Sequence, residues 1–489
     1  MVKFYRLIFF TVLSFSIFSC KRDEPIINLA ESEYPSEVGK IILTKCAVSG
    51  CHNAASKEAA SGLNLESWQT MMQGGRNGAV AIPFSHKMST LFLFTNTYQD
   101  LGVSVYPTMP ISAEKLSREE INLLQNWLDS GAPNANGFVK FSDNNQRKKY
   151  YVTNQACDLV AVVDQQTGLI MRYIQVGVKN EIEGPHMVKV SNDGKYWMVC
   201  FINSNVFQVF DAAADALISS ITIDSISQGN WNTFALSDDN KYAFVVDWSA
   251  NGKVAVVDLQ TFTNPITYRG NNLFVFPHGS AYRNNTLYVT GQTGNFIYKI
   301  NVSDILSPEI EEMSLEPGVP ITFSSKLDAH EIAFNPAGDK YFVTCQKSNE
   351  IRVFSTQNDN LLSIIQLNEY PQEMSFSNSK PYLFVSCTED RKTFPGVIGS
   401  VAVINYETLS LVKYIDTGFQ PHGIAVDDAK SKVYVAHRNV VSEGPAPHHT
   451  SDCGGRNGYV TAIDMNTLER IPGSKFEVAP DPYSVSIRK

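Results

Sequence analysis

The clearest chemical signature in the sequence is a pair of cysteines followed directly by a histidine, at Cys46, Cys51 and His52. Two thiols beside an imidazole form the pattern that attaches a c-type haem, because the thiols add to the haem vinyl groups and the histidine reaches the iron. The usual pattern has two residues between the cysteines, whereas this sequence has four. The motif therefore predicts one covalent haem c, held by a longer attachment loop than usual.

Two other interpretations of the same cysteines stay open. A structural zinc site needs four nitrogen or sulfur ligands, and the nearest other candidate, His86, has no companion cysteine. In an oxidising compartment, Cys46 and Cys51 could instead form a disulfide. The three interpretations differ in whether the thiols carry haem, bind metal or pair with each other.

Helices are expected on both sides of this motif. An apolar helical face leads into Cys46, and a second one follows the capping-box pattern at residues 117–120. Gly131 and Pro133 then supply the usual signals for the end of a helix. The two faces consist of Val38, Ile41 and Ile42 in the first helix and Ile121, Leu124, Trp127 and Leu128 in the second.

Short motifs on either side of the cysteines extend the pattern over residues 34–136, which resemble the planctomycete-type cytochrome c domain in the order and spacing of those motifs. The resemblance implies a small all-α haem domain in which the methionine of a Met-Pro pair, here Met109, is the second axial ligand beside His52. A His/Met pair raises the haem potential, which suits a one-electron carrier. The motifs are Gly62-Leu63-Asn64-Leu65, Gly74-Gly75-Arg76-Asn77-Gly78, Ile82-Pro83, Ser89-Thr90-Leu91, Met109-Pro110 and the segment from Leu116 to Ala132.

From residue 145 onward one strand pattern recurs. Aligned on the second, aromatic strand of each unit, successive repeats start 42–54 residues apart. Periods of about 40–50 residues with short strands are typical of propeller blades. The pattern predicts an all-β propeller of seven blades, whose second strands are Tyr150–Asn154, Tyr196–Cys200, Tyr242–Val246, Leu287–Gly291, Tyr341–Cys345, Leu383–Cys387 and Val433–His437.

The segment Tyr151-Val152-Thr153-Asn154, together with Pro-His-Gly at 277–279 and 421–423, resembles the YVTN-type β-propellers. The resemblance covers residues 145–489 and implies a fold rather than a function. The first blade has no inner strand of its own, and Tyr483–Ile487 at the C-terminus is expected to supply it. That pairing would close the ring and protect its sheet edges.

Two sets of metal-capable residues occupy matching places in the repeats, at the start of inner strands and at the end of second strands. Both places lie on one face of a propeller, so these side chains are expected to point toward one mouth of the channel. Imidazole and thiolate together suit copper or zinc. Two observations argue against a metal site: Pro-His is part of the repeat pattern itself, and cysteines at strand ends are often simply buried. The sets are His186, His278, His330 and His422, and Cys200, Cys345, Cys387 and His437; the insertion at 438–459 adds His448, His449 and Cys453.

The N-terminus resembles the leader of bacterial lipoproteins. Lys3 and Arg6 precede an apolar run at residues 7–18, shorter than the ~20 residues of a bilayer span but suited to a signal-peptide core. The residues before Cys20 resemble the lipobox, in which cleavage leaves the cysteine as a lipid-carrying first residue. Loss of the two basic residues would change the formal charge from −9 to −11. The chain is therefore expected at the cell envelope, lipid-anchored at Cys20, on the periplasmic or surface side of the outer membrane.

The composition agrees with this organisation. The 49 acidic residues outnumber the 40 basic ones, which argues against nucleic acid as a partner. The expected parts are a signal peptide at 1–19, a linker at 20–33, the haem domain at 34–136 and the propeller at 145–489. Of the eight cysteines, one is assigned to lipid and two to haem. The remaining five are an odd number, and Cys157 has no evident partner, so at least one free thiol is expected.

The expected function is one-electron transfer through a single haem, from or to a redox partner protein, with the propeller as a docking or ligand platform. One alternative is an oxidoreductase whose metal or substrate site lies on the top face of the propeller and passes electrons to the haem. Another is a non-enzymatic surface-binding protein. The sequence has no phosphate loop, nucleophile elbow or zinc-protease motif, so no catalytic residue is assigned.

Overall fold

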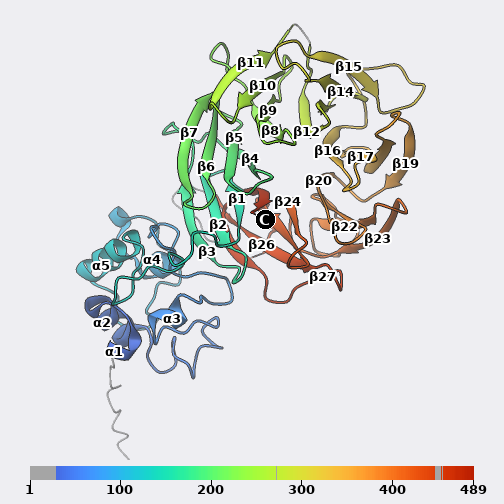
Figure 1. Cartoon of the computed structure of the whole chain (residues 1–489). Coiled ribbons are helices and arrows are strands. Elements are labelled where there is room, and N and C mark those ends of the chain that lie inside the picture. Colours follow the sequence, from blue (N-terminus) through green and yellow to red (C-terminus); the bar gives the residue numbers. More distant parts are fainter. Residues whose placement is uncertain (1–28, 271–272, 446–452, 454, 489) are drawn as a thin grey trace, which may run out of the picture.

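A computed structural model describes residues 29–270, 273–445, 453 and 455–488. A helical N-terminal segment lies beside a ring of β-sheets (Figure 1). Cys20 and the leader lie outside the described residues, as do His448 and His449. Within the described ranges, no helix combines the length and the apolar character that a membrane span requires.

The helical segment consists of short helices joined by long loops. The longest helix, α5, begins as the sequence predicts: the Ser117 hydroxyl accepts from the amide of Glu120 at 3.3 Å, and the Glu120 carboxylate accepts from the amide of Ser117 at 2.7 Å. Past its end, Gly131 adopts a left-handed φ of 101°. The helices are α1 (Leu29–Ser32), α2 (Ser36–Lys45), α3 (Trp68–Met71), α4 (Thr90–Thr95) and α5 (Arg118–Asp129), with a 3-10 turn η1 (Gln99–Leu101).

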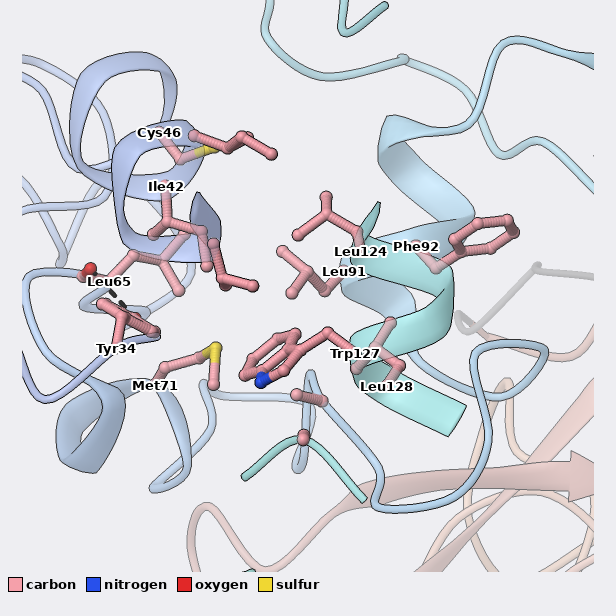
Figure 2. Close-up of a cluster of buried hydrophobic side chains, with 14 of the residues drawn as sticks. Tyr34, Ile42, Cys46, Leu65, Met71, Leu91, Phe92, Leu124, Trp127 and Leu128 are labelled. Atoms are coloured by element: carbon pink, nitrogen blue, oxygen red, sulfur yellow. Dashed lines mark hydrogen bonds between the residues drawn. The ribbon is translucent and has the colours of Figure 1, made fainter. Parts of the chain in front are cut away.

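One apolar core holds these helices together. Ile42 of α2 and Trp127 of α5 enter it from opposite sides, and Cys46 packs into the same cluster (Figure 2). The indole Nε1 of Trp127 donates to the carbonyl of Pro133 at 2.9 Å, so its polar edge is satisfied. The two apolar faces expected from the sequence are confirmed, because Val38, Ile41, Ile42, Ile121, Leu124, Trp127 and Leu128 are all buried in this core.

The rest of the chain forms the seven-bladed, all-β propeller that the repeats predict (Figure 1). Each blade is an antiparallel sheet whose inner strand faces the central channel and contacts the inner strands of its neighbours.

Blade 1 contains β29 (Pro482–Ile487), β1 (Lys149–Asn154), β2 (Leu159–Asp164) and β3 (Ile170–Gln175). Blade 2 contains β4 (Pro185–Val190), β5 (Tyr196–Phe201), β6 (Val206–Asp211) and β7 (Ala216–Thr222), and blade 3 contains β8 (Trp231–Leu236), β9 (Tyr242–Asp247), β10 (Lys253–Asp258) and β11 (Thr263–Tyr268). Blade 4 contains β12 (Pro277–Arg283), β13 (Thr286–Gly291), β14 (Phe296–Asn301) and β15 (Glu309–Ser314), and blade 5 contains β16 (Ala329–Phe334), β17 (Lys340–Cys345), β18 (Glu350–Ser355) and β19 (Leu361–Gln366). Blade 6 contains β20 (Pro371–Phe376), β21 (Tyr382–Cys387), β22 (Ser400–Asn405) and β23 (Ser410–Ile415), and blade 7 contains β24 (Pro421–Asp427), β25 (Lys432–His437), β26 (Asn457–Asp464), β27 (Glu469–Arg470) and β28 (Phe476–Pro480), which also pairs with β26.

The C-terminal strand closes the ring, as expected. β29 pairs with β1 in antiparallel register, with Tyr150 opposite Ile487 and Val152 opposite Val485. The first blade is thus built from both ends of the propeller sequence, and its inner strand is hydrogen-bonded instead of leaving β1 as an open edge.

The helical segment packs against blades 1 and 7. Ile82 is buried in one apolar cluster with Tyr150 of β1 and Phe476 of β28. The backbones also meet, because the amide of Glu477 donates to the carbonyl of Asn77 at 3.1 Å. Gly78 permits this approach, since a Cβ added there would lie 2.9 Å from the Cβ of Phe476. The contact joins the two parts at the point where the propeller ring closes.

A disulfide links Cys157 to Cys453, 296 residues apart in sequence. The expectation that Cys157 lacks a partner is therefore wrong. Cys157 follows β1 and Cys453 lies in the insertion between β25 and β26, so the bond ties the insertion of blade 7 to blade 1. Cys200, Cys345 and Cys387 remain free, which agrees with the expectation of at least one unpaired thiol.

Acid is expected to weaken a buried ion-pair cluster between blades 2 and 3. Asp224 contacts Lys253 at 2.8 Å and Arg269 at 2.7 Å. Burial acts to raise the pKa of Asp224, but the hydrogen bonds from Lys253 and Arg269 outweigh it and hold the pKa at about 2, below the usual 3.8. Because the folded-state pKa is depressed, the contribution is present above about pH 4 and is lost as the pH falls through about 2.

The variant Asp224→Asn should therefore lower the free energy of unfolding by about 1–3 kcal/mol at pH 6. Urea unfolding at a series of pH values should show the difference from the wild type shrinking between pH 4 and pH 2. A difference that stays constant over that range would contradict the assignment.

Candidate functional site

The cysteines and histidine of the attachment motif come together at the end of α2. Cys46 is the residue that ends the helix, and its amide donates to the carbonyl of Ile42 at 2.9 Å. The chain then folds back: the amide of Cys51 donates to Val48 at 3.0 Å, and the amide of His52 donates to the carbonyl of Cys46 at 3.1 Å. The four residues between the cysteines thus form a compact turn that returns Cys51 and His52 to Cys46.

Both thiols of the motif are free. Burial, with a smaller effect of nearby Cys51, raises the pKa of Cys46 to about 12, so this thiol is protonated at neutral pH. Within the part of the chain that the structure describes, no group of three or more metal-ligating atoms contains Cys46, Cys51 or His52. The zinc and disulfide interpretations therefore gain no support from the geometry.

The imidazole of His52 has the properties of a ligand. Its Nδ1 atom is buried and has no hydrogen-bond partner among the described residues. Burial lowers the pKa of His52, and the carbonyls of Leu63 and Ala60 oppose that effect. The ring is therefore neutral at neutral pH, the form in which histidine binds a metal.

Met109 lies in the loop between η1 and α5, next to α4. Its amide donates to the carbonyl of Phe94 in α4 at 2.7 Å, and its side chain is half-buried. Lys115 steadies this loop by donating to the carbonyls of Thr108 at 2.8 Å and Pro110 at 2.5 Å. Leu91 of α4 and Cys46 at the end of α2 pack in one cluster, so the helix that contacts the Met109 backbone and the helix that ends at Cys46 share one core (Figure 2).

The donor set fits a haem c. Two free thiols lie beside a neutral imidazole whose buried Nδ1 lacks a hydrogen-bond partner among the described residues, and the backbone of Met109 bonds to α4, which packs in the same core. The side chains of this core are apolar, which excludes water and favours a high potential. Other residues expected near the site have ordinary roles: His86 bonds the carboxylate of Asp129 through Nδ1 at 2.7 Å, and Met71 is buried in the core.

A second group of residues gathers in the propeller channel. The four predicted histidines are each the second residue of an inner strand, in β4, β12, β16 and β24. All four are buried. In the other three blades this position is taken by Asn232, Gln372 and Tyr483. The repeat thus places one polar or aromatic side chain from each blade around the axis, and the histidines are His186, His278, His330 and His422.

The four imidazoles and Tyr483 form a connected ring. The centroid of His278 lies 4.0 Å from that of His330, which is 6.3 Å from His422. His422 lies 3.7 Å from the ring of Tyr483, which in turn lies 4.1 Å from His186. The structure therefore brings together all four histidines of the first predicted set.

The second predicted set does not join them, so the expectation that all these residues face one mouth is wrong. Cys200, Cys345 and Cys387 are buried in the apolar cores within and between blades. Both ring nitrogens of His437 are occupied, Nδ1 by the carbonyl of Phe419 at 3.1 Å and Nε2 by the hydroxyl of Thr461 at 2.9 Å. The last side chain of a second strand points into the sheet-to-sheet packing rather than into the channel, because strand residues alternate between faces.

One acidic residue at the histidine ring was missed by the sequence reasoning. Glu373 is the third residue of β20, and its Oε1 lies 3.9 Å from Nε2 of His330. Burial, followed by the neighbouring Glu331, raises the pKa of Glu373 to about 8. Aligning the third positions of the inner strands would have found both glutamates, since apart from Glu331 and Glu373 these positions hold methionine, threonine, glycine or serine.

Comparisons with known proteins give no family assignment. No family model matches the chain, and no curated protein matches it. Among solved structures, Kuenenia stuttgartiensis hydrazine synthase is 16% identical, with a TM-score of 0.44 over 64% of this chain and 90% of that one. Apo AztD from Citrobacter koseri is 13% identical, with a TM-score of 0.45 over 70% of this chain and 97% of that one. The dihydro-heme d1 dehydrogenase NirN in complex with DHE is 12% identical, with a TM-score of 0.48 over 77% of this chain and 88% of that one. At these identities and TM-scores the matches say nothing about the activity of this chain.

Proposed function

We propose that this chain is a cell-envelope electron-transfer protein that carries one covalent haem c in the segment 34–136. The observation that carries the proposal is the compact turn at the end of α2, where two free thiols lie beside His52 and its unpartnered, buried Nδ1. Cys46 is buried and Cys51 and His52 are half-buried. A buried polar atom without a partner, such as Nδ1 of His52, costs free energy unless a ligand satisfies the ring.

Each residue has a separate role in this proposal. Cys46 and Cys51 would hold the group through thioether bonds, and His52 and Met109 would ligate its iron. When bound, the haem supplies reversible one-electron chemistry. The apolar side chains of α2 and α5 keep water from the site, and the turn at 46–52 holds the imidazole in place through the His52 amide bond to Cys46.

The remaining parts of the chain provide location and partner contact. Lipid on Cys20 anchors the protein to the envelope, and the propeller at 145–489 is a platform for a redox partner protein or a ligand. The packing of Ile82 and Gly78 on blades 1 and 7 supports this, because it holds the haem-bearing segment against the platform.

A redox difference spectrum of the purified mature protein tests the proposal. The protein should be produced with a haem-attachment system, and haem and iron should be measured on the denatured polypeptide. One haem per chain that stays bound after denaturation is the expected result. Folded protein without covalent haem would overturn the proposal and favour a surface-binding role.

The ligand Met109 can be tested separately with Met109→Leu, a change that nearly conserves side-chain volume. The variant should keep covalent haem but lose the methionine-ligated spectrum, and its midpoint potential should fall by on the order of 0.1 V or more, within the ~0.8 V range that axial ligands set. Potentiometric titration measures the shift. Met72→Leu, at a methionine buried in the same core, is the matched control. An unchanged spectrum in Met109→Leu would exclude Met109 as the ligand.

A further inference from the structure

We propose that His330, His422 and Glu373 form a binding site for a divalent transition-metal ion, of which Zn²⁺ is the representative, inside the propeller channel. The site is independent of the haem proposal. One ligand atom from each of these side chains lies within 4.8 Å of the other two. Among the described residues, no other group of three or more such side chains meets this condition.

The two histidines have nitrogen atoms free to bind. His422 uses Nδ1 to contact the carbonyl of Tyr483 at 2.9 Å, which requires the proton on Nδ1 and leaves the lone pair on Nε2. That Nε2 is buried and has no hydrogen-bond partner among the described residues, and the same is true of both ring nitrogens of His330. His330 is 3% exposed and His422 is 1% exposed, so water does not satisfy these atoms at the surface. Buried nitrogens without partners are costly, and a shared metal ion would satisfy them together.

The scaffold holds the histidines close to the spacing that two ligands of one metal ion need. His278 contacts the carbonyl of His330 through Nδ1 at 3.0 Å, which fixes the start of β16 relative to β12. The His330 ring stands between His278 and His422, with its Nε2 3.9 Å from Glu373 Oε1. Metal–nitrogen and metal–oxygen bonds are about 2.0–2.2 Å long, so two ligand atoms on one ion lie about 3–3.5 Å apart. Small side-chain rotations therefore suffice to bring the ligands onto one ion.

The chemistry of the donors selects the kind of ion. Two neutral imidazoles and one carboxylate suit Zn²⁺ and related first-row ions, and the free thiols of Cys200, Cys345 and Cys387 are buried elsewhere in the blades. Burial lowers the pKa of both His330 and His422, so the rings are neutral and able to bind at neutral pH.

Several charged or titratable groups surround the site. Glu331 of β16 and Lys189 of β4 face the Glu373 carboxyl, and Lys189 acts to lower its pKa while burial and Glu331 raise it to about 8. The cation near His422 is Arg438, which forms an ion pair with Asp481 at 2.6 Å. The other groups around His330 are His278 and His186.

The channel gives an ion a route to the site. A cavity of about 530 Å³ runs along the inner strands, and all seven blades contribute to its wall. Glu331 and Glu373 line this cavity together with Lys189, whereas the histidines lie beyond them at the strand starts. Glu373 thus faces both the cavity and His330, as a ligand at the inner end of an ion path would.

Zinc binding to the full mature protein tests the proposal. The protein is stripped with a chelator, dialysed against ZnCl₂ at pH 7.5, and analysed for zinc and iron by mass spectrometry. One zinc per chain is expected, with iron unchanged. Glu373→Gln and the double variant His330→Ala/His422→Ala should bind zinc at least ~100-fold more weakly, since each removes a direct ligand rather than a supporting residue, whose loss costs ~10–100-fold. Asn232→Ala, at the matching position of blade 3, is the control and should bind normally.

Two further measurements keep the result decisive. Glu373→Gln preserves the shape of the side chain, so it carries the test if the double histidine variant fails to fold by circular dichroism. Calorimetric titration with ZnCl₂ measures the affinity of the wild type and of Glu373→Gln directly. Full zinc binding by folded Glu373→Gln, or no zinc on the folded wild type, would overturn the proposal. Because zinc and haem iron are counted separately, failure of either proposal leaves the other intact.

Discussion

The double variant Cys46→Ala/Cys51→Ala is expected to contain no covalently bound haem, whereas the wild type should contain one haem per chain. Both thiols are free and lie on one turn with His52, and the sequence has no second pair of this kind. Without them the only remaining bonds are those of the axial ligands, and haem held in that way is lost when the polypeptide is denatured. Haem stain of the denatured chain and a reduced-minus-oxidised spectrum measure the effect.

The matched control for this change is Cys345→Ala/Cys387→Ala. These two thiols are 0% exposed, against 8% for Cys46, and they lie in the blades of the propeller. Removing them is expected to leave the haem content unchanged while lowering the stability of the propeller, because each change removes a packed sulfur. Equal haem content in both double variants would contradict the assignment of Cys46 and Cys51.

Replacing Lys149 with alanine is expected to destabilise the propeller by about 3–5 kcal/mol. Lys149 begins β1, and its Nζ donates to the Asp215 carboxylate at 2.8 Å and to the carbonyl of Ala213 at 3.0 Å. Both side chains are almost fully buried, at 2% and 0% exposure. The change would leave the Asp215 charge buried, and among the described residues its remaining side-chain partner is the hydroxyl of Tyr151, at 3.1 Å. Urea or thermal unfolding measures the loss.

The location of this ion pair explains the size of the expected effect. Lys149 lies in blade 1 beside the closing strand β29, and Asp215 lies in the turn between β6 and β7 of blade 2. The pair therefore ties together two blades next to the ring closure. The control Lys195→Ala removes an exposed pair with Asp193, 3.0 Å apart, and should cost about 0–1 kcal/mol. Similar losses in the two variants would show that the buried pair has no special role.

Local patterns in the sequence predicted most of the architecture. The capping box at Ser117, the left-handed Gly131 and the apolar face of α5 depend on residues within one or two turns, and the structure confirms them. The second strands of all seven blades were found in the same way, because each blade repeats one short pattern of apolar and turn residues. Repetition also located the histidines, since matching positions in a repeat must lie at matching places around the ring.

Contacts between distant parts of the chain could not be found in that way. Glu373 meets His330 only because neighbouring blades pack at a particular angle, and it occupies a different repeat position from the histidines. The disulfide between Cys157 and Cys453 depends on the path of a long insertion, and the packing of Gly78 on Phe476 depends on how the helical segment meets blades 1 and 7.

The sequence by itself determined the two longest helices, the strands of the blades and most of the residues that could bind haem or metal, because those properties depend on a residue and its near neighbours. Only the tertiary structure decided which of them meet. In the tertiary structure the four channel histidines lie together and Glu373 lies beside them. The thiols of Cys200, Cys345 and Cys387 are buried in the blades. The physical reason is that side-chain direction alternates along a strand, so a shift of one position separates a residue that faces the channel from one that packs between sheets.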